Sequence, residues 1–149
     1  MKRYICLITL ALTTLLISSC SQEDDINEIF IGKTWYMTGG RLNGSALNTE
    51  VANFYTNPEA YVMIFQAGTF TGTLSSGVTF SGTWQVNAQN RKMSLNISRS
   101  TSMSLPFDNN VYTVLKNITY YKGDSNYLEL FQDNNNFIRF SNTRSPNAN

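Results

Sequence analysis

The feature that most constrains this chain is a strict alternation of apolar and polar residues between short turn-forming stretches. In its clearest instance Val78, Phe80 and Trp84 fall on one face of an extended segment, while hydroxyl and amide side chains fall on the other. Successive side chains of a β-strand point to opposite faces, so a period of two predicts a half-buried strand. Gly82 interrupts the apolar face, which predicts a bend or a place where a side chain of another strand crosses closely.

The same alternation recurs often enough to define the fold class. It predicts about eight strands, at residues 33–38, 61–65, 69–74, 78–86, 93–97, 118–121, 127–131 and 136–140. Most are separated by a few turn-forming residues, so neighbouring strands are expected to run antiparallel. Residues 61–65 are apolar on both faces, which predicts a strand buried from both sides. We therefore expect a mainly β fold, a small barrel or curled sheet that leaves no exposed edges.

One segment departs from this period. Val111, Val114 and Leu115 recur at helical spacing, and Asp108 precedes them as a candidate N-cap. The spacing predicts one short helix near residues 109–116.

The N-terminus has the features of a targeting segment. Lys2 and Arg3 precede an apolar run of about 14 residues, which is shorter than the ~20 residues needed to span a bilayer. Small residues lead directly to Cys20, and this order resembles the signal peptide of bacterial lipoproteins. The resemblance implies a signal peptide at residues 1–19, cleavage between Ser19 and Cys20, and acylation of Cys20. The alternatives are an ordinary secretory signal and a transmembrane anchor.

The residues after the modified cysteine indicate an address. Ser21 stands where such families carry Asp when a lipoprotein is retained at the inner membrane. The acidic run Glu23, Asp24 and Asp25 resembles the export tags that some Gram-negative lineages use for surface display. Alternatively, the acidic run is only part of a solvated tether. We place the lipidated cysteine and this tether at residues 20–29. We expect an outer-membrane lipoprotein of a Gram-negative bacterium, with surface display as a further expectation.

After cleavage about 130 residues remain, which suits one domain, predicted at residues 30–142 and followed by a disordered tail at 143–149. The loss of Lys2 and Arg3 lowers the basic count from 11 to 9 against 10 acidic residues, so the mature net charge is −1. Because no basic field results, nucleic acid is excluded as a partner, and the membrane is reached through the lipid anchor.

The mature chain is poor in catalytic and metal-binding groups. It has no histidine, and its two cysteines are Cys6, in the signal peptide, and Cys20, the lipid carrier. Sites of the Ser–His and Cys–His type, the common zinc sites and disulfides are therefore excluded. Asp124 and Asp133 open Asn-rich stretches that resemble calcium loops, but each stretch offers one acid, and Asx turns explain both. We predict no metal and no cofactor.

The acidic side chains give little support for an enzyme. Glu129, Asp108, Glu50 and Glu59 could pair for glycoside hydrolysis, but nothing in their spacing brings two of them together. Glu129, on the outer face of a strand, reads as a solvated residue.

The aromatic residues are a stronger candidate for a binding site. They make up 13% of the chain, and the strand at residues 127–131 carries bulky groups on both faces. Tyr127, Phe131 and Phe137 could line a binding surface for a sugar, an apolar ligand or another protein. The alternative is that the helix and the tether cover both faces of this strand.

Several motifs resemble those of META-domain (heat-shock HslJ-like) envelope lipoproteins. Residues 77–84 are similar to the central strand motif of that family, and Trp35 matches its early tryptophan. The Thr-Ser-Met step at 101–103 precedes the predicted helix, and the strands at 120–123 and 128–130 follow in the order of the family. The resemblance implies a barrel-like envelope domain more than an activity.

Two observations limit that resemblance. This chain has Val78 and Thr79 where the family often has Cys-Asn, and no partner cysteine follows Met103, so no feature that depends on those cysteines is implied. The Gly-Lys-Thr-Trp stretch at 32–35, followed by alternating strands, also resembles small lipocalin-like lipoproteins.

These observations favour a non-enzymatic, lipid-anchored protein whose β domain binds an unknown protein or small-molecule ligand, or supports the envelope. The alternatives are an enzyme-inhibitor-like module that acts through its loops and, with the least support, a carboxylate hydrolase.

Overall fold

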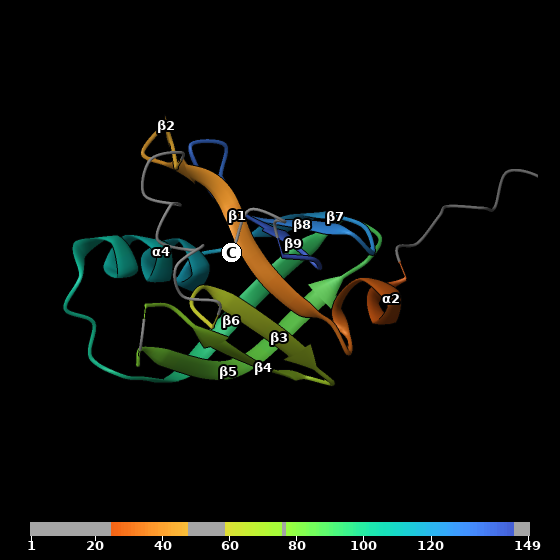
Figure 1. Ribbon diagram of the computed structural model, residues 1–149. Helices are drawn as coiled ribbons and strands as arrows, with labels where there is room; N and C mark the ends of the chain where they lie inside the picture. The colour runs from red at the N-terminus through yellow and green to blue at the C-terminus, as the bar shows by residue number, and fades with distance from the viewer. Residues whose placement is uncertain (1–24, 48–58, 76, 145–149) are drawn as a thin grey trace, which may run out of the picture.

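The structure, a computed structural model, describes residues 25–47, 59–75 and 77–144. Within these residues, eight antiparallel strands form a closed barrel in which each pairs with the next and the last pairs with the first (Figure 1). They are β1 (Thr34–Leu42), β3 (Val62–Gln66), β4 (Thr69–Thr73), β5 (Thr79–Asn87), β6 (Lys92–Ser100), β7 (Tyr120–Gly123), β8 (Tyr127–Asp133) and β9 (Asn136–Ser141). The short strand β2 (Ser45–Ala46) pairs with the end of β1. The expected mainly β fold is confirmed.

Several predicted features lie outside the described residues. These are the signal peptide, the end of the tail, and the residues Ser19, Cys20, Glu23 and Asp24. Among the residues that the structure does describe, no helix is long and apolar enough to cross a membrane.

The interior of the barrel is filled with side chains. Residues from most strands and from both helices are buried there, and the largest fully buried ones include Trp35, Phe30, Phe65, Phe70, Tyr121, Leu128, Leu130, Ile138 and Val111. An apolar gap beside Met37, Met63 and Phe140 has ≈ 0 Å³ of space for a water-sized sphere. The barrel therefore encloses a packed core, as small eight-stranded barrels can.

Helix α2 (Ile26–Phe30) closes the end of the barrel at which β1 begins (Figure 1). Phe30 is fully buried, and its ring centroid lies 5.1–5.2 Å from the centroids of Phe65, Trp84 and Tyr121. These contacts make the helix part of the core, because four large rings pack together at one end of the barrel.

The start of α2 lies within the segment that the sequence assigned to the tether, residues 20–29. Asp25, one residue of the predicted export tag, caps the helix by accepting a hydrogen bond from the Glu28 N–H at 3.0 Å. Ile29 is buried as well. Folded structure therefore begins no later than Asp25.

Helix α4 (Pro106–Lys116) closes the opposite end and connects β6 to β7 (Figure 1). Val111, Val114 and Leu115 are buried against the barrel, as their helical spacing predicted. The helix near residues 109–116 is therefore confirmed, although it begins earlier than predicted.

Asp108 is not the N-cap that the sequence predicted. The helix starts at Pro106, whose ring suits the first helical position, and the N-cap is Leu105, which makes no side-chain capping bond. Asp108 is instead fully buried in the first turn, where its carboxylate accepts hydrogen bonds from Tyr61 Oη (2.7 Å) and from Ser75 Oγ. These donors lie 47 and 33 residues away in the chain, so local spacing could not reveal them.

The pairing between β6 and β7 is the shortest among the described strands of the barrel. Its register consists of Lys92 opposite Tyr120, and the Met93 N–H donates to the Thr119 carbonyl at 3.1 Å. Helix α4 packs against β6, β8 and β9. The helix thus lies beside the part of β6 that has no strand neighbour, which is one way to protect a sheet edge.

The strand predicted to be buried from both sides is β3, and that prediction is wrong. Met63 and Phe65 face the interior, whereas Ile64 is 37% exposed on the outside. A closed barrel has one buried face, so apolar residues at consecutive positions of a strand cannot all be covered by its interior.

Candidate binding surface on the barrel wall

The outer face of β7, β8, β9 and β1 carries the aromatic residues that the sequence singled out. In the register of these strands Tyr120 lies opposite Phe131, Phe131 opposite Phe137, and Phe137 opposite Arg41. Directly paired residues point to the same face, so the four side chains form one row across four strands. We call this surface the aromatic wall and define it by the outward side chains of Tyr36, Arg41, Tyr120, Lys122, Tyr127, Glu129, Phe131, Phe137 and Arg139.

Three rings of this row are stacked. The centroids of Tyr120 and Phe131 are 4.5 Å apart with an interplanar angle of 7°, and those of Phe131 and Phe137 are 4.8 Å apart at 26°. Such pairs contribute about 0.5–1.5 kcal/mol each beyond burial. The central ring, Phe131, is 5% exposed although it lies on the outside, because its neighbours cover it.

A charged row crosses the same strands beside the rings. Lys122 lies opposite Glu129, and Glu129 opposite Arg139. Arg139 Nε and Nη2 lie 2.8 and 2.7 Å from Glu129 Oε1, and Lys122 Nζ lies 4.9 Å from the Phe131 centroid. The Glu129 side chain is 14% exposed, so the prediction of an ordinary solvated residue is wrong. Its carboxylate is held by a guanidinium, which gives a stronger hydrogen bond than a neutral donor.

Tyr127 lies in a third row, nearer the α2 end of the barrel. It is 45% exposed and lies opposite Ser141, which in turn lies opposite Tyr36. The Arg144 guanidinium lies 4.9 Å from the Tyr36 ring centroid. The structure therefore brings the three predicted aromatics to one wall but in two rows, with Phe131 and Phe137 together and Tyr127 apart.

Helix α4 does not cover this wall. Its Val111 and Leu115 line the same apolar gap as the inward-facing Met37 and Phe140, on the interior side of the sheet. The outer rings are shielded by one another and by the cations beside them. The bulky residues on the outer face of β8 are thus covered by neighbouring side chains of the sheet, an arrangement that the sequence did not predict.

The Tyr120 hydroxyl anchors one end of the stacked rings. It donates a hydrogen bond to Asn134 Oδ1 at 3.0 Å in the turn between β8 and β9. Partial burial of the phenol, and then the nearby carboxylates of Asp133 and Glu129, raise the pKa of Tyr120 above its ordinary value. Tyr120 therefore remains a neutral donor throughout the physiological pH range.

The two Asp-containing turns are Asx turns, as predicted. Asp124 Oδ1 accepts the Asn126 N–H at 2.7 Å, and Asp133 Oδ1 accepts the Asn135 N–H at 2.8 Å. Hydrogen bonds from the Asn136 side-chain amide and then from the Asn135 N–H lower the pKa of Asp133. Among the described residues no three acidic, His or Cys side chains are grouped so that they could hold a metal ion.

Of the acids considered for hydrolysis, the three that the structure describes are not brought together. Asp108 is buried in α4, Glu129 is paired on the outer wall, and Glu59 is exposed near the start of β3. Glu50 lies outside the described residues.

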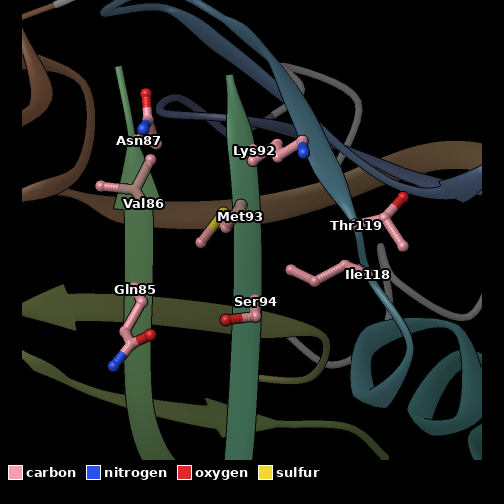
Figure 2. A pocket seen from close by; sticks show the side chains of 8 residues that line it. All are labelled: Gln85, Val86, Asn87, Lys92, Met93, Ser94, Ile118 and Thr119. Carbon is pink, nitrogen blue, oxygen red and sulfur yellow. The ribbon is translucent and has the colours of Figure 1, made fainter. Parts of the chain in front are cut away.

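A concave surface lies where β6 and β7 diverge (Figure 2). It encloses ≈ 550 Å³ and is lined by Gln85, Val86, Asn87, Lys92, Met93, Ser94, Ile118 and Thr119. Met93 and Ile118 supply a buried apolar floor, but Gln85, Asn87 and Lys92 point in different directions. The polar groups of a ligand site usually converge, and these do not. The side chains of the aromatic wall contact one another, so the wall is the better candidate.

Sequence reasoning missed the cations of the wall. A signal for two of them was present, because Lys122 and Arg139 each lie two residues from an aromatic residue of their own strand. Arg41 had no such signal, since its neighbour Phe137 belongs to the last strand and meets it through closure of the barrel.

Two solved structures have folds similar to that of this chain. A crystal structure of a DUF4847 family protein from Bacteroides vulgatus has 26% sequence identity to this chain and a TM-score of 0.66, and the match covers 80% of this chain and 99% of that one. An NMR structure of a protein from Burkholderia xenovorans has 15% identity and a TM-score of 0.55, covers 78% and 84% of the two chains, and shows similarity of fold alone. No curated protein matches. The model of the family described as "Domain of unknown function (DUF4847)" matches residues 21–142, and the chain belongs to this family.

Proposed function

We propose that this protein is a lipid-anchored binding protein without catalytic activity, which recognises its partner through the aromatic wall. The observation that carries the proposal is the filled interior. A barrel that carries a ligand needs an internal cavity, and the described interior is occupied by large side chains such as Trp35, Phe65 and Tyr121. Recognition is then left to the outer surface, where the stacked rings and the cations of the wall lie.

The sequence around Cys20 supports the anchor. Four residues lie between Cys20 and Asp25, where described structure begins, and the five residue-to-residue steps span at most about 17 Å. An acylated Cys20 would therefore hold the α2 end of the barrel close to the membrane. Ser21, and the acids Glu23 and Asp24, support an outer-membrane address with surface display.

We also propose that the barrel is related to the lipocalin-like and META-domain lipoproteins that the sequence resembles. The meander order of the strands, closed by pairing of β1 with β9, supports a lipocalin-like barrel. The order of α4, β7 and β8 agrees with the META-domain resemblance.

The anchor is tested with the Cys20→Ala variant in cells fed a radiolabelled fatty acid. We expect the label to be lost and the uncleaved precursor to accumulate, as it should when signal peptidase II is inhibited in the wild type. Continued labelling of Cys20→Ala would show that the anchor is elsewhere.

The choice of surface recognition over carriage is tested by native mass spectrometry of protein extracted from envelopes. We expect the acylated chain alone, because the interior has no room for a ligand. A stoichiometric apolar molecule that survives purification would contradict the proposal and favour a carrier.

A further inference from the structure

We propose that the aromatic wall binds an extended acidic segment of a partner protein. This inference rests on the proposed function, since it names the chemistry of the partner that the wall would recognise.

The charge distribution is the first argument. Within residues 25–47, 59–75 and 77–144, one side of the barrel carries five basic residues on or beside the wall: Arg41, Lys92, Lys122, Arg139 and Arg144. The acids on or beside the wall are Glu129, which Arg139 neutralises at 2.7 Å, and Asp124 and Asp133 in the turns at the two ends of β8. The wall is thus basic in a mature chain whose net charge is −1, and such an asymmetry attracts an acidic partner.

The orientation of the rings is the second argument. The faces of Tyr120, Phe131 and Phe137 are turned toward one another, and Lys122 lies over Phe131. A neutral sugar stacks on an exposed ring face, but Phe131 has a ring stacked on each side, and Tyr120 and Phe137 each turn one face to Phe131. The edge of an aromatic ring is the positive part of its quadrupole, so it favours the oxygen atoms of a carboxylate.

The wall already shows how it holds a carboxylate. Glu129 lies between Lys122 and Arg139 in the register of the strands, and Arg139 directs two nitrogen atoms at one of its oxygens. Arg41 and Lys92 are exposed at the two ends of the aromatic row, opposite Phe137 and Tyr120. These cations are placed to receive the carboxylates of an incoming chain.

The size of the wall favours an extended segment of a partner over the surface of a folded domain. Neighbouring strands lie about 4.8 Å apart, so the backbones under Lys122 and Arg139 are roughly 10 Å apart and the whole wall is roughly 15–20 Å wide. A standard protein interface buries about 800 Å² on each partner, more than such a patch supplies. An extended segment of about six residues spans the same distance. Tyr, Phe and Arg, which make up most of the wall, are also the residues enriched at protein interfaces.

The test uses the mature acylated protein in nanodiscs of zwitterionic lipid and a fluorescein-labelled poly-L-glutamate of about ten residues at low ionic strength. Fluorescence anisotropy is expected to show binding that weakens with salt. The double variant Arg41→Gln/Lys122→Gln removes two charges from the wall and should weaken binding about tenfold. The matched control is Thr71→Glu/Thr83→Glu, which lowers the net charge equally on the exposed outer faces of β4 and β5.

The outcomes separate this inference from the proposed function. Equal weakening in both double variants would show attraction by net charge alone and overturn the inference, as would an absence of binding to the wild type. Dextran sulfate and nanodiscs with anionic lipid form the other arms. If either binds through Arg41 and Lys122 while poly-L-glutamate does not, recognition by the wall stands but its partner is not an acidic peptide.

Discussion

Gly82 shows at the scale of a residue how one position controls the course of two strands. A Cβ atom at Gly82 would lie 2.0 Å from the Asn96 carbonyl oxygen, and the register of β5 against β6 shifts between Ser81 and Gly82. The glycine allows the two backbones to approach where the shift occurs. The sequence predicted a bend or the close crossing of a side chain from another strand; the group that approaches Gly82 is instead a backbone carbonyl of β6.

The Gly82→Ala variant should therefore be less stable by roughly 2–3 kcal/mol, because the methyl group must displace a backbone atom. Urea denaturation measures the change. The control is Thr83→Ala, at an exposed neighbouring position, which should shift stability by less than about 0.5 kcal/mol. Equal effects would show that the two backbones can separate at Gly82.

Asp133, in the turn between β8 and β9, should make the stability of the protein depend on pH. Its folded pKa is lowered, first by the Asn136 side chain and then by the Asn135 N–H. The contribution of Asp133 to stability is thus present above its unfolded pKa of about 3.9 and is lost as the pH falls through the folded value. The stability difference between wild type and Asp133→Asn should be largest near neutral pH and shrink toward about pH 3. Urea midpoints at several pH values check this, and a difference that is independent of pH would contradict it.

At the scale of elements, α4 is held to the barrel by a buried polar contact. Asp108 accepts hydrogen bonds from Tyr61, just before β3, and from Ser75, just after β4. A carboxylate without exposure must be satisfied by such donors, because burial removes its water. The contact therefore ties the helix to the end of the barrel that it closes.

Asp108→Ala should lower the free energy of unfolding by about 2–4 kcal/mol, since it leaves two hydroxyl groups without their acceptor. Ser75→Ala removes one donor and should cost about 1 kcal/mol. Thermal and urea denaturation give both values. If the two variants are equally stable, Asp108 does not hold α4.

A similar prediction concerns helix α2, at the opposite end of the barrel. Phe30→Ala should destabilise the protein by about 3–5 kcal/mol, because it empties the site between Phe65, Trp84 and Tyr121. Ile64→Ala, at a position that is 37% exposed, serves as the control and should cost much less. Similar losses in the two variants would mean that α2 is not part of the core.

At the scale of the whole molecule, the weakest join among the described strands of the barrel is the short pairing of β6 with β7, which we call the seam. β6 and β7 are joined at Lys92 and Tyr120, whereas β8 and β9 pair along their length. Local opening follows the elements with the fewest interactions. Opening of the barrel should therefore start at this seam, beside the concave surface of Figure 2.

Native-state hydrogen exchange tests this directly. The Met93 and Tyr121 amides, which bond to the Thr119 and Arg91 carbonyls across the seam, should open at least about ten times more often than amides of β8. Exchange of all these amides at one rate would show that the barrel opens as a single unit.

The sequence by itself determined the strands of the barrel, the Asx turns and the helical connection between β6 and β7. Alternation of apolar and polar residues reports which face of a strand is buried, and Asp–Asn turns act through neighbouring backbone groups, so both are local properties. Tertiary structure alone decided the rest. The pairing of β1 with β9 sets Arg41 beside Phe137, and the end of the barrel sets Tyr61 and Ser75 around Asp108. Those contacts join residues far apart in the chain, and they depend on strand register and closure, which a pattern of period two does not specify.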